Sequence, residues 1–484
     1  MFVKQRAKPI GRTMRVALVS LAVALSVIAR LGSDFSGGFL EKAGFPALRP
    51  RFTRSQIESF LPANGARGAF RFPAPYNTQG IRLTNASDCG GQDCVDYVGY
   101  SYWRNINNHT FHDWMLIVIG MDRRFGGAGP SLLAYNKVTD EVRNLGPLFD
   151  PTNPASYATG EGWYFSAVRP STLYVYLVGT SYLWRYDVIT HQAEPALELP
   201  KCTGSGVCPS TAAYIFQPHS SDDDQVHSAT VEDLSFNRLG CVVYRANGQF
   251  RFYAPPAGSF LDECQIDKSG NWLVLLEVSL STGAETNRIV NMQTGAITTI
   301  DDFQGALGHL DTGWGYAVGA DNWNPFPNAT ILLKFPVAST QRPIGPVVHF
   351  NKRWDIVAAN HVAHGNARPG APEGQYACGS NASRVPDMAD EIVCFPLDAN
   401  RNVDGTLDVL VVTQVMTDLD ALGGRDIDGD DYTQLPKGNL DVTGSYFIWT
   451  SNAGGDRLDA FLVKVPSALL TTRTPSIQTT MLAR

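Results

Sequence analysis

From about residue 95 onward, the chain consists of short apolar runs rich in β-branched and aromatic residues, separated by turns of Gly, Asn, Asp and Pro. The clearest runs are Trp114–Ile119, Leu173–Val178, Cys241–Tyr244, Trp272–Leu276, Ile331–Phe335, Val409–Val412 and Tyr446–Thr450. The sequence between them has no long amphipathic pattern, and α/β folds need a helix between their parallel strands. We therefore predict an all-β fold. Hydrophobic residues make up 44% of the 484, which is enough for a large core.

The runs belong to a repeat in which a tight polar turn leads into an apolar strand. The turn occurs as Asp267-Lys-Ser-Gly270, Asp441-Val-Thr-Gly444, Arg169-Pro-Ser-Thr172 and Asn237-Arg-Leu-Gly240. Units starting near residues 105, 163, 230, 262, 307, 360 and 437 give seven repeats of about 53 residues. This period, with four strands in each unit, predicts a β-propeller of seven blades. A β-sandwich is the alternative, but it does not require such a period.

The repeat divides the chain into four parts. We expect a signal peptide at 1–29, an N-terminal extension at 30–94, the propeller at 95–466 and a C-terminal tail at 467–484. Capping-box patterns predict one short helix in the extension, near residues 53–61. The longest propeller loops are expected at 366–393 and 418–433.

The polar turn resembles the Ser-Pro-Asp-Gly-like turn of secreted or periplasmic propellers of the TolB and oligogalacturonate-lyase type. Here it is degenerate, as in Asp267-Lys-Ser-Gly270. The resemblance covers most of residues 95–466 and implies the propeller fold. It does not by itself imply an activity, because propellers carry out unrelated functions.

The first residues predict export. Five basic side chains precede residue 16, and an apolar run of about 14 residues follows from Val16 to Ala29. Val27 and Ala29 stand at the −3 and −1 positions of a cleavage site. An uncleaved anchor is the alternative. No later segment has 18 consecutive apolar residues, so we expect no membrane span in the mature chain and a secreted or periplasmic location.

The eight cysteines also favour export. They fall in close pairs, and the simplest interpretation is disulfide bonding between sequence neighbours: 89–94, 202–208, 241–264 and 378–394. Other connectivities are possible in principle. A zinc site is the alternative, but the chain lacks a C-x₂-C pair, and exported proteins favour disulfides.

The charge balance argues against a nucleic-acid partner. The chain has 39 basic and 46 acidic residues and a net charge of −7, and loss of the five basic residues of the signal segment would leave −12. A protein that neutralises phosphates needs a basic face.

A column of polar residues is expected along the central channel. Aligning the turns places one residue from each of six units on the first strand, and most of them are polar: Ala167, Ser235, Gln265, His309, Asn366 and Asn439. Polar side chains converging on one axis predict a ligand pocket for a glycan or protein partner, with Lys437 beside Asn439. A hydrated channel without a ligand is the alternative.

A second set of residues suggests a metal. His361 and His364 lie three residues apart, and His309 comes from the preceding unit. Lyases of the resembling type hold a divalent ion with several histidines and a glutamine, and Gln434 is the counterpart of that glutamine. If these residues hold a metal, the resemblance implies a metal-dependent polysaccharide lyase acting on uronic-acid-containing glycans, with Lys437, Tyr432 or Arg368 as base or carboxylate clamp. Structural or surface histidines are the alternative.

Two further segments are rich in aspartate. In Asp426-Ile-Asp-Gly-Asp-Asp431, the carboxylates of Asp426, Asp428 and Asp430 suit Ca²⁺, although an acidic solvated loop is an equal interpretation. Asp222-Asp-Asp224 is interpreted as an exposed turn. The two functional hypotheses are therefore a binding module for a glycan or protein and a metal-dependent lyase.

Overall fold

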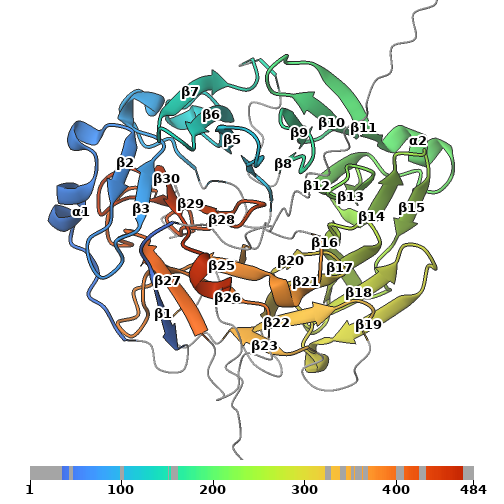
Figure 1. Ribbon diagram of the computed structural model, residues 1–484. Helices are drawn as coiled ribbons and strands as arrows, with labels where there is room; N and C mark the ends of the chain where they lie inside the picture. Colours follow the sequence, from blue (N-terminus) through green and yellow to red (C-terminus); the bar gives the residue numbers. More distant parts are fainter. Residues whose placement is uncertain are drawn as a thin grey trace, which may run out of the picture. The chain divides into compact units, whose positions relative to one another are not determined.

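The computed structural model confirms a β-propeller of seven blades. It describes residues 35–42, 47–96, 98, 103–150, 152–153, 162–321, 329–337, 345–349, 354, 362–363, 369–398, 408–424 and 432–471. The chain separates into two units, 1–31 and 32–484, and the first lies outside the described residues. In the second unit, seven antiparallel sheets succeed one another in chain order (Figure 1).

Blades 1 to 5 are each built from four consecutive strands. Blade 1 contains β4 (Ile106–Asn107), β5 (Trp114–Ile119), β6 (Ser131–Asn136) and β7 (Val142–Pro147). Blade 2 contains β8 (Trp163–Phe165), β9 (Thr172–Tyr176), β10 (Tyr182–Asp187) and β11 (Ala193–Glu198). Blade 3 contains β12 (Tyr214–Ser220), β13 (Val226–Glu232), β14 (Arg238–Arg245) and β15 (Phe250–Tyr253). Blade 4 contains β16 (Ser259–Ile266), β17 (Trp272–Ser279), β18 (Glu285–Asn291) and β19 (Ile297–Asp301). Blade 5 contains β20 (Leu310–Thr312), β21 (Tyr316–Asp321), β22 (Ala329–Lys334) and β23 (Val347–His349).

Blades 6 and 7 each have five strands, because N-terminal segments join them. Blade 6 contains β24 (Val362–Ala363), β25 (Tyr376–Ser380), β26 (Glu391–Pro396), β27 (Asp408–Gln414) and β1 (Phe39–Lys42). Blade 7 contains β28 (Asn439–Leu440), β29 (Tyr446–Ser451), β30 (Asp459–Lys464), β3 (Gln79–Arg82) and β2 (Gly68–Arg71). The propeller thus takes strands from both sides of the boundary predicted at residue 95, and pairing of β3 with β30 closes the ring.

The helices are short. They are α1 (Arg54–Phe60), α2 (Leu199–Gly204) and α3 (Ala468–Thr471), with 3₁₀ turns at Ala63–Gly65, Ala86–Cys89, Arg123–Phe125, Asp302–Gln304 and Pro372–Gly374. The helix predicted near residues 53–61 is confirmed, with the expected capping box between Thr53 and Gln56. None of the helices in the described part of the chain is long and apolar enough to cross a membrane.

The apolar runs are continuous because neighbouring blades cover both faces of each sheet. In β17, for example, the five residues Leu273–Glu277 are all buried. Between blades 3 and 4, Val226 and Val243 pack against Leu261, Leu273 and Leu275. A strand buried on two faces has no reason to alternate apolar and polar residues, so the sequence pattern is a consequence of blade stacking.

Six of the seven predicted unit starts lie within three residues of the first strand of a blade, but the third is wrong. Blade 3 begins at Tyr214, not near residue 230. The turn used for the alignment, Asn237-Arg-Leu-Gly240, leads into β14, the third strand of the blade. The first hairpin instead closes where the Ser221 amide donates to the Val226 carbonyl at 2.9 Å.

All four predicted disulfides are present. Cys378 and Cys394 lie opposite each other on β25 and β26. Cys202–Cys208 closes the α2 segment between blades 2 and 3. Cys241–Cys264 joins β14 of blade 3 to β16 of blade 4, so it links adjacent blades.

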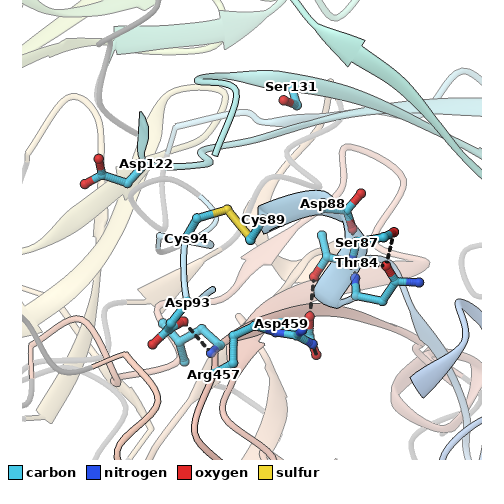
Figure 2. The surroundings of a disulfide bond; sticks show 12 residues. Thr84, Ser87, Asp88, Cys89, Asp93, Cys94, Asp122, Ser131, Arg457 and Asp459 are labelled. Carbon is cyan, nitrogen blue, oxygen red and sulfur yellow. Dashed lines mark hydrogen bonds and ion pairs between the residues drawn. A yellow bond between two sulfur atoms is a disulfide. The ribbon is translucent and has the colours of Figure 1, made fainter. Parts of the chain in front are cut away.

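The fourth disulfide, Cys89–Cys94, lies just before blade 1, where the chain crosses from blade 7 (Figure 2). Next to it, the carboxylate of Asp93 accepts hydrogen bonds from the amides of Gly424 at 2.6 Å and Leu458 at 2.8 Å. The disulfide therefore holds in place a carboxylate that fastens this crossing segment to blade 7.

We expect loss of the inter-blade disulfide to destabilise the protein more than loss of the short one. Cys241 and Cys264 are 23 residues apart, whereas Cys89 and Cys94 are 5 apart. Loop-closure entropy then gives about 3 kcal/mol for the first and about 2 kcal/mol for the second. Denaturant unfolding of the two double alanine variants would measure this, and the reverse order would contradict the entropic argument.

An N-terminal clasp, residues 47–82, fastens blade 6 through the buried carboxylate of Glu391, which is 1% exposed. Arg49 donates to it from Nε at 2.7 Å and from Nη2 at 3.0 Å. The hydroxyl of Tyr76 donates at 2.5 Å, and the indole of Trp354 donates at 2.7 Å. The negative charge of Glu391 therefore organises contacts from three distant parts of the chain.

The neighbouring carboxylate, Asp390, pairs with Arg51 at 2.6 Å. Burial raises the pKa of Asp390 to about 7, Arg51 lowers it in part, and the charges of Glu391 and Asp418 raise it further. The folded chain therefore holds a proton on Asp390 at a pH where the unfolded chain has released it.

Because of this proton, the free energy of unfolding of Asp390→Asn, relative to that of wild type, should rise with pH. Asp390 binds its proton near pH 7 in the folded chain and near pH 4 in the unfolded chain, so its contribution to the free energy of unfolding falls between these values. Because Arg51 is partly exposed, loss of its ion pair costs little. We expect the stability of the variant relative to wild type to increase from about pH 5 to about pH 8, by up to about 3 kcal/mol. Urea unfolding at both values measures this, and a difference independent of pH would refute it.

Candidate functional site

A cavity of about 380 Å³ lies where the first and second strands of the blades are joined. Its described lining residues are Asn108, His109, Thr110, Ala167, Val168, Asp222, Asp223, Trp314, Pro369, Val442 and Thr443. They come from the segments between the first two strands of blades 1, 2, 3, 5, 6 and 7. Segments of six blades can meet only around the propeller axis, so the cavity is the mouth of the central channel.

The hairpin hydrogen bonds show which residues are equivalent in the blades. The amides that close the first hairpin belong to Ser166, Ser221, Asp267, Gly313 and Asp441. The residues two positions before these five are, in the same order, Tyr164, His219, Gln265, Asp311 and Asn439. The structure therefore places Gln265 and Asn439 in the predicted column.

The other described members of the predicted column are corrected. The hairpin of blade 5 is shorter, with Gly313 bonded to Tyr316, so Asp311 rather than His309 occupies the column. In blade 3 the position belongs to His219, and Ser235 lies in the exposed β13–β14 turn. In blade 2 it belongs to Tyr164, while Ala167 lines the cavity in the following turn.

The remaining predicted ligand residues are held by local contacts or lie outside the described residues. The Lys437 ammonium donates to the Tyr432 carbonyl and lies 3.5 Å from the centre of its ring. The amide nitrogen of Gln434 donates to the carbonyls of Ala421 at 2.8 Å and Gly423 at 3.1 Å. His309 is half-buried, and burial lowers its pKa, with a smaller opposing effect from Asp262. The predicted residues outside the described ranges are His361, His364, Asn366, Arg368, Asp426, Asp428 and Asp430.

In the described ranges, no group of three or more His, Cys, Asp or Glu side chains is arranged to hold a metal ion. Gln265 illustrates a different kind of contact. Its amide nitrogen donates to the Glu263 carboxylate and to the Leu310 carbonyl at 2.9 Å, so it links blades 4 and 5.

Asp222, which lines the cavity, is fixed by residues from two other blades. Arg104, just before β4, donates from Nη2 to Asp222 Oδ1 at 2.8 Å. Trp314, in the hairpin of blade 5, donates from its indole nitrogen to Asp222 Oδ2 at 3.1 Å. Asp222–Asp224 is therefore only in part the exposed turn that we predicted, because Asp223 is exposed, whereas Asp224 is buried and Asp222 is largely covered. The cause is tertiary: the partners of Asp222 are about a hundred residues away in the sequence.

Behind Asp222, a second cation is buried with its partners. Lys268 donates to the Tyr164 hydroxyl at 3.0 Å and to Asp311 at 3.1 Å, and its carbonyl accepts the Asp222 amide at 2.9 Å. Burial lowers the pKa of Lys268, but Asp311 and Tyr164 outweigh it and raise the pKa above its ordinary value. The pKa of Arg104 behaves in the same way, with burial opposed by Tyr164 and Asp222. Both side chains are cationic at neutral pH.

Two histidines near the cavity, His109 and His219, are neutral. Burial lowers the pKa of His219 to about 3, and the charge of Lys268 lowers it further. Burial lowers the pKa of His109 to about 4, with added effects from His112, Arg104 and Lys137. His219 packs against the rings of Trp103 and Tyr164, whereas His109 lines the cavity.

Several solved propellers have similar folds. An oligogalacturonate lyase from Vibrio parahaemolyticus is 10% identical, with a TM-score of 0.53 over 90% of this chain and 100% of that one. An oligogalacturonate lyase in complex with manganese is 12% identical, with a TM-score of 0.39 over 84% of this chain and 97% of that one. A TolB-type protein from Agrobacterium tumefaciens is 10% identical, with a TM-score of 0.37 over 69% of this chain and 98% of that one.

The chain shares the propeller fold. At these identities the likeness is one of fold, and the activity must be argued from the chain's own residues. The sequence matches no protein-family model and no curated protein.

Proposed function

We propose that the protein is an exported binding propeller that takes a glycan in the cavity at the mouth of its channel. The observation that carries this proposal is the cavity itself, which six blades build from carboxylate, amide and hydroxyl groups beside an indole ring. Its volume of about 380 Å³ lies in the range of small-molecule sites. The polar groups suit sugar hydroxyls, and the flat ring of Trp314 suits the apolar face of a sugar.

The rigidity of the site supports this proposal. Most of the lining residues belong to short turns between paired strands, and Asp222 is held by hydrogen bonds from Arg104 and Trp314. A site on rigid elements loses little conformational freedom when a ligand binds. The four disulfides support export, because such bonds persist in oxidising compartments.

Calorimetric titration of the full chain with neutral and acidic hexasaccharides tests the proposal. A cavity-filling variant, Ala167→Trp, should abolish binding, while Val178→Trp, in the exposed β9–β10 turn, should bind as wild type. If no hexasaccharide binds, or if Ala167→Trp binds as tightly as wild type, the proposed site is wrong.

A metal-dependent lyase is the second candidate, and His109 favours it. Its neutral imidazole lines the cavity, and its Nε2 has no hydrogen-bond partner among the described residues, so it can accept a proton. Elemental analysis of protein purified without chelator would test for the metal, with His309→Ala/His364→Ala as the comparison. A transition metal lost in that variant, together with unsaturated products from galacturonan, would establish the lyase. Bound calcium that is unchanged in the variant would instead indicate a calcium site at Asp426–Asp431.

A further inference from the structure

We infer that the glycan of the proposed function is neutral, and that Asp222 anchors it by accepting hydrogen bonds from sugar hydroxyls. This inference rests on the proposed function and adds the ligand class and the anchoring residue. It depends on four observations: the fixed carboxylate of Asp222, the charge of the cavity wall, the donors of Arg104, and the exposed ring of Phe111.

The carboxylate of Asp222 is preorganised and keeps acceptor capacity. Its two oxygens each receive one hydrogen bond, from Arg104 and Trp314, and its side chain is 13% exposed. A carboxylate has about four lone-pair sites, so each oxygen can accept another donor. Because blades 1 and 5 hold these oxygens in place, a ligand that binds them does not have to order the side chain first.

The charge of the cavity wall disfavours an acidic ligand. Among the described lining residues, Asp222 and Asp223 are acidic, and none is a lysine or arginine. Of the cations near the cavity, Arg104 and Lys268 are buried and already bonded to carboxylates, and Lys137 is bonded to Asn108 Oδ1 and to the His109 carbonyl. A uronate carboxylate entering the cavity would meet like charge, and like-charge contacts disfavour binding. Hydroxyl groups meet no such penalty.

The donors of Arg104 select further for hydroxyls. Arg104 is 4% exposed, and its Nε and Nη1 atoms are buried with no hydrogen-bond partner among the described residues. A buried donor without an acceptor is costly, so an acceptor must reach it. Arg104 and Asp222 are in contact at 2.8 Å, so one ligand group can meet both. The best such group accepts a hydrogen bond from Arg104 and donates one to Asp222. A hydroxyl does both, whereas an ionised carboxylate can only accept.

Phe111 offers the apolar side of the site. It follows the three lining residues 108–110 directly in the chain, and it is 98% exposed. A fully exposed aromatic ring has no role in the core, and this one stands one residue from the cavity lining in the chain, where a ligand can contact it. Val168, which lines the same cavity, is also exposed. The ring of Phe111 can therefore cover the apolar face of a sugar whose hydroxyls reach Asp222.

The charge preference is tested with a matched pair of ligands. The probes are neutral hexaoses of glucose, mannose, xylose and galactose, and galacturonan hexamer as the free acid and as the methyl ester, which differ in charge and in one methyl group per residue. We expect a neutral hexaose to bind at least about tenfold more tightly than the free acid, and the ester more tightly than the acid. Tighter binding of the free acid would overturn this inference and leave the proposed function standing, whereas no binding of any probe would overturn both.

The anchor is tested by substitution, with the best neutral hexaose as the probe. Asp222→Asn should weaken binding by about tenfold or more, because hydrogen bonds to a charged acceptor are lost. Asp233→Asn, at the opposite end of β13, removes an equal charge far from the cavity and should bind as wild type. Equal affinities of the two variants would overturn the assignment of Asp222.

Asp222→Asn leaves the buried Arg104 without its ion pair and can lose binding by misfolding. A second variant that keeps the fold intact is therefore needed. Phe111→Ala alters a fully exposed residue and should keep the thermal stability of wild type while weakening binding about fivefold. Leu234→Ala, which also removes an exposed apolar side chain, is the control and should change neither property. If Phe111→Ala binds the hexaose as tightly as wild type, Phe111 does not contact the ligand.

Discussion

Glu391→Ala is expected to lower the free energy of unfolding by about 3–5 kcal/mol. The carboxylate is buried, and its partners include Arg49, Tyr76 and Trp354. Burial opposes the charge of Arg49, but Glu391 and Glu41 raise its pKa above the ordinary value, so the guanidinium stays charged. The variant leaves this cation half-buried with one carboxylate fewer, and it leaves the buried Tyr76 hydroxyl without its acceptor.

The control is Glu58→Ala, which removes a carboxylate from the same N-terminal clasp. Glu58 pairs with Arg54 on α1, and both side chains are exposed, so its loss should cost less than about 0.5 kcal/mol. Urea unfolding followed by tryptophan fluorescence measures both variants. Similar losses in the two would show that the clasp does not depend on the buried carboxylate.

The repeat could be predicted from the sequence because its turn has a local physical cause. In blade 4, Asp267 Oδ1 accepts the amides of Asn271 and Trp272, each at 2.9 Å. In blade 7, Asp441 Oδ1 accepts the amides of Ser445 and Tyr446, each at 2.7 Å. Each aspartate satisfies the backbone donors of its own hairpin, so the same residue pattern recurs wherever the hairpin recurs.

The same hydrogen bonding by aspartate explains why the start of blade 3 was predicted near residue 230 and not at Tyr214. In the β13–β14 turn, Asp233 Oδ1 accepts the amides of Ser235 and Asn237 at 2.8 and 2.9 Å. This turn therefore resembles a first hairpin in composition, although it joins the second and third strands. A local pattern identifies a capped turn, but it does not identify the turn's position in the blade.

The site was harder to predict, because its contacts are remote in the sequence. Arg104, Asp222 and Trp314 come from blades 1, 3 and 5, and no local pattern relates them. The strand Phe39–Lys42 was missed for a similar reason. It is four residues long and partly buried throughout, and it pairs with the edge strand β27 of blade 6. Its conformation is set by its partner rather than by its own residues.

Lys268→Met is expected to destabilise the protein by about 3–5 kcal/mol. The Lys268 side chain is 2% exposed, and the partners of its ammonium group are Asp311 and Tyr164. Removal of the cation leaves the buried Asp311 with a negative charge and one donor fewer. The carbonyl of Lys268 also accepts the Asp222 amide, so loss of order here should weaken glycan binding as well.

A double-mutant cycle separates the destabilisation caused by an unpaired buried charge from the net stabilisation that the Lys268–Asp311 pair provides. Lys268→Met/Asp311→Leu removes both charges, and we expect it to recover at least about 2 kcal/mol relative to Lys268→Met, because no uncompensated charge stays buried. Lys201→Met is the control, because Lys201 is exposed and pairs with Glu198 in solvent, where such pairs contribute little. A double variant less stable than Lys268→Met would show that each side chain stabilises the fold independently of the other. In that case the buried pair would contribute through its separate contacts with neighbouring blades, and not through mutual compensation of charge.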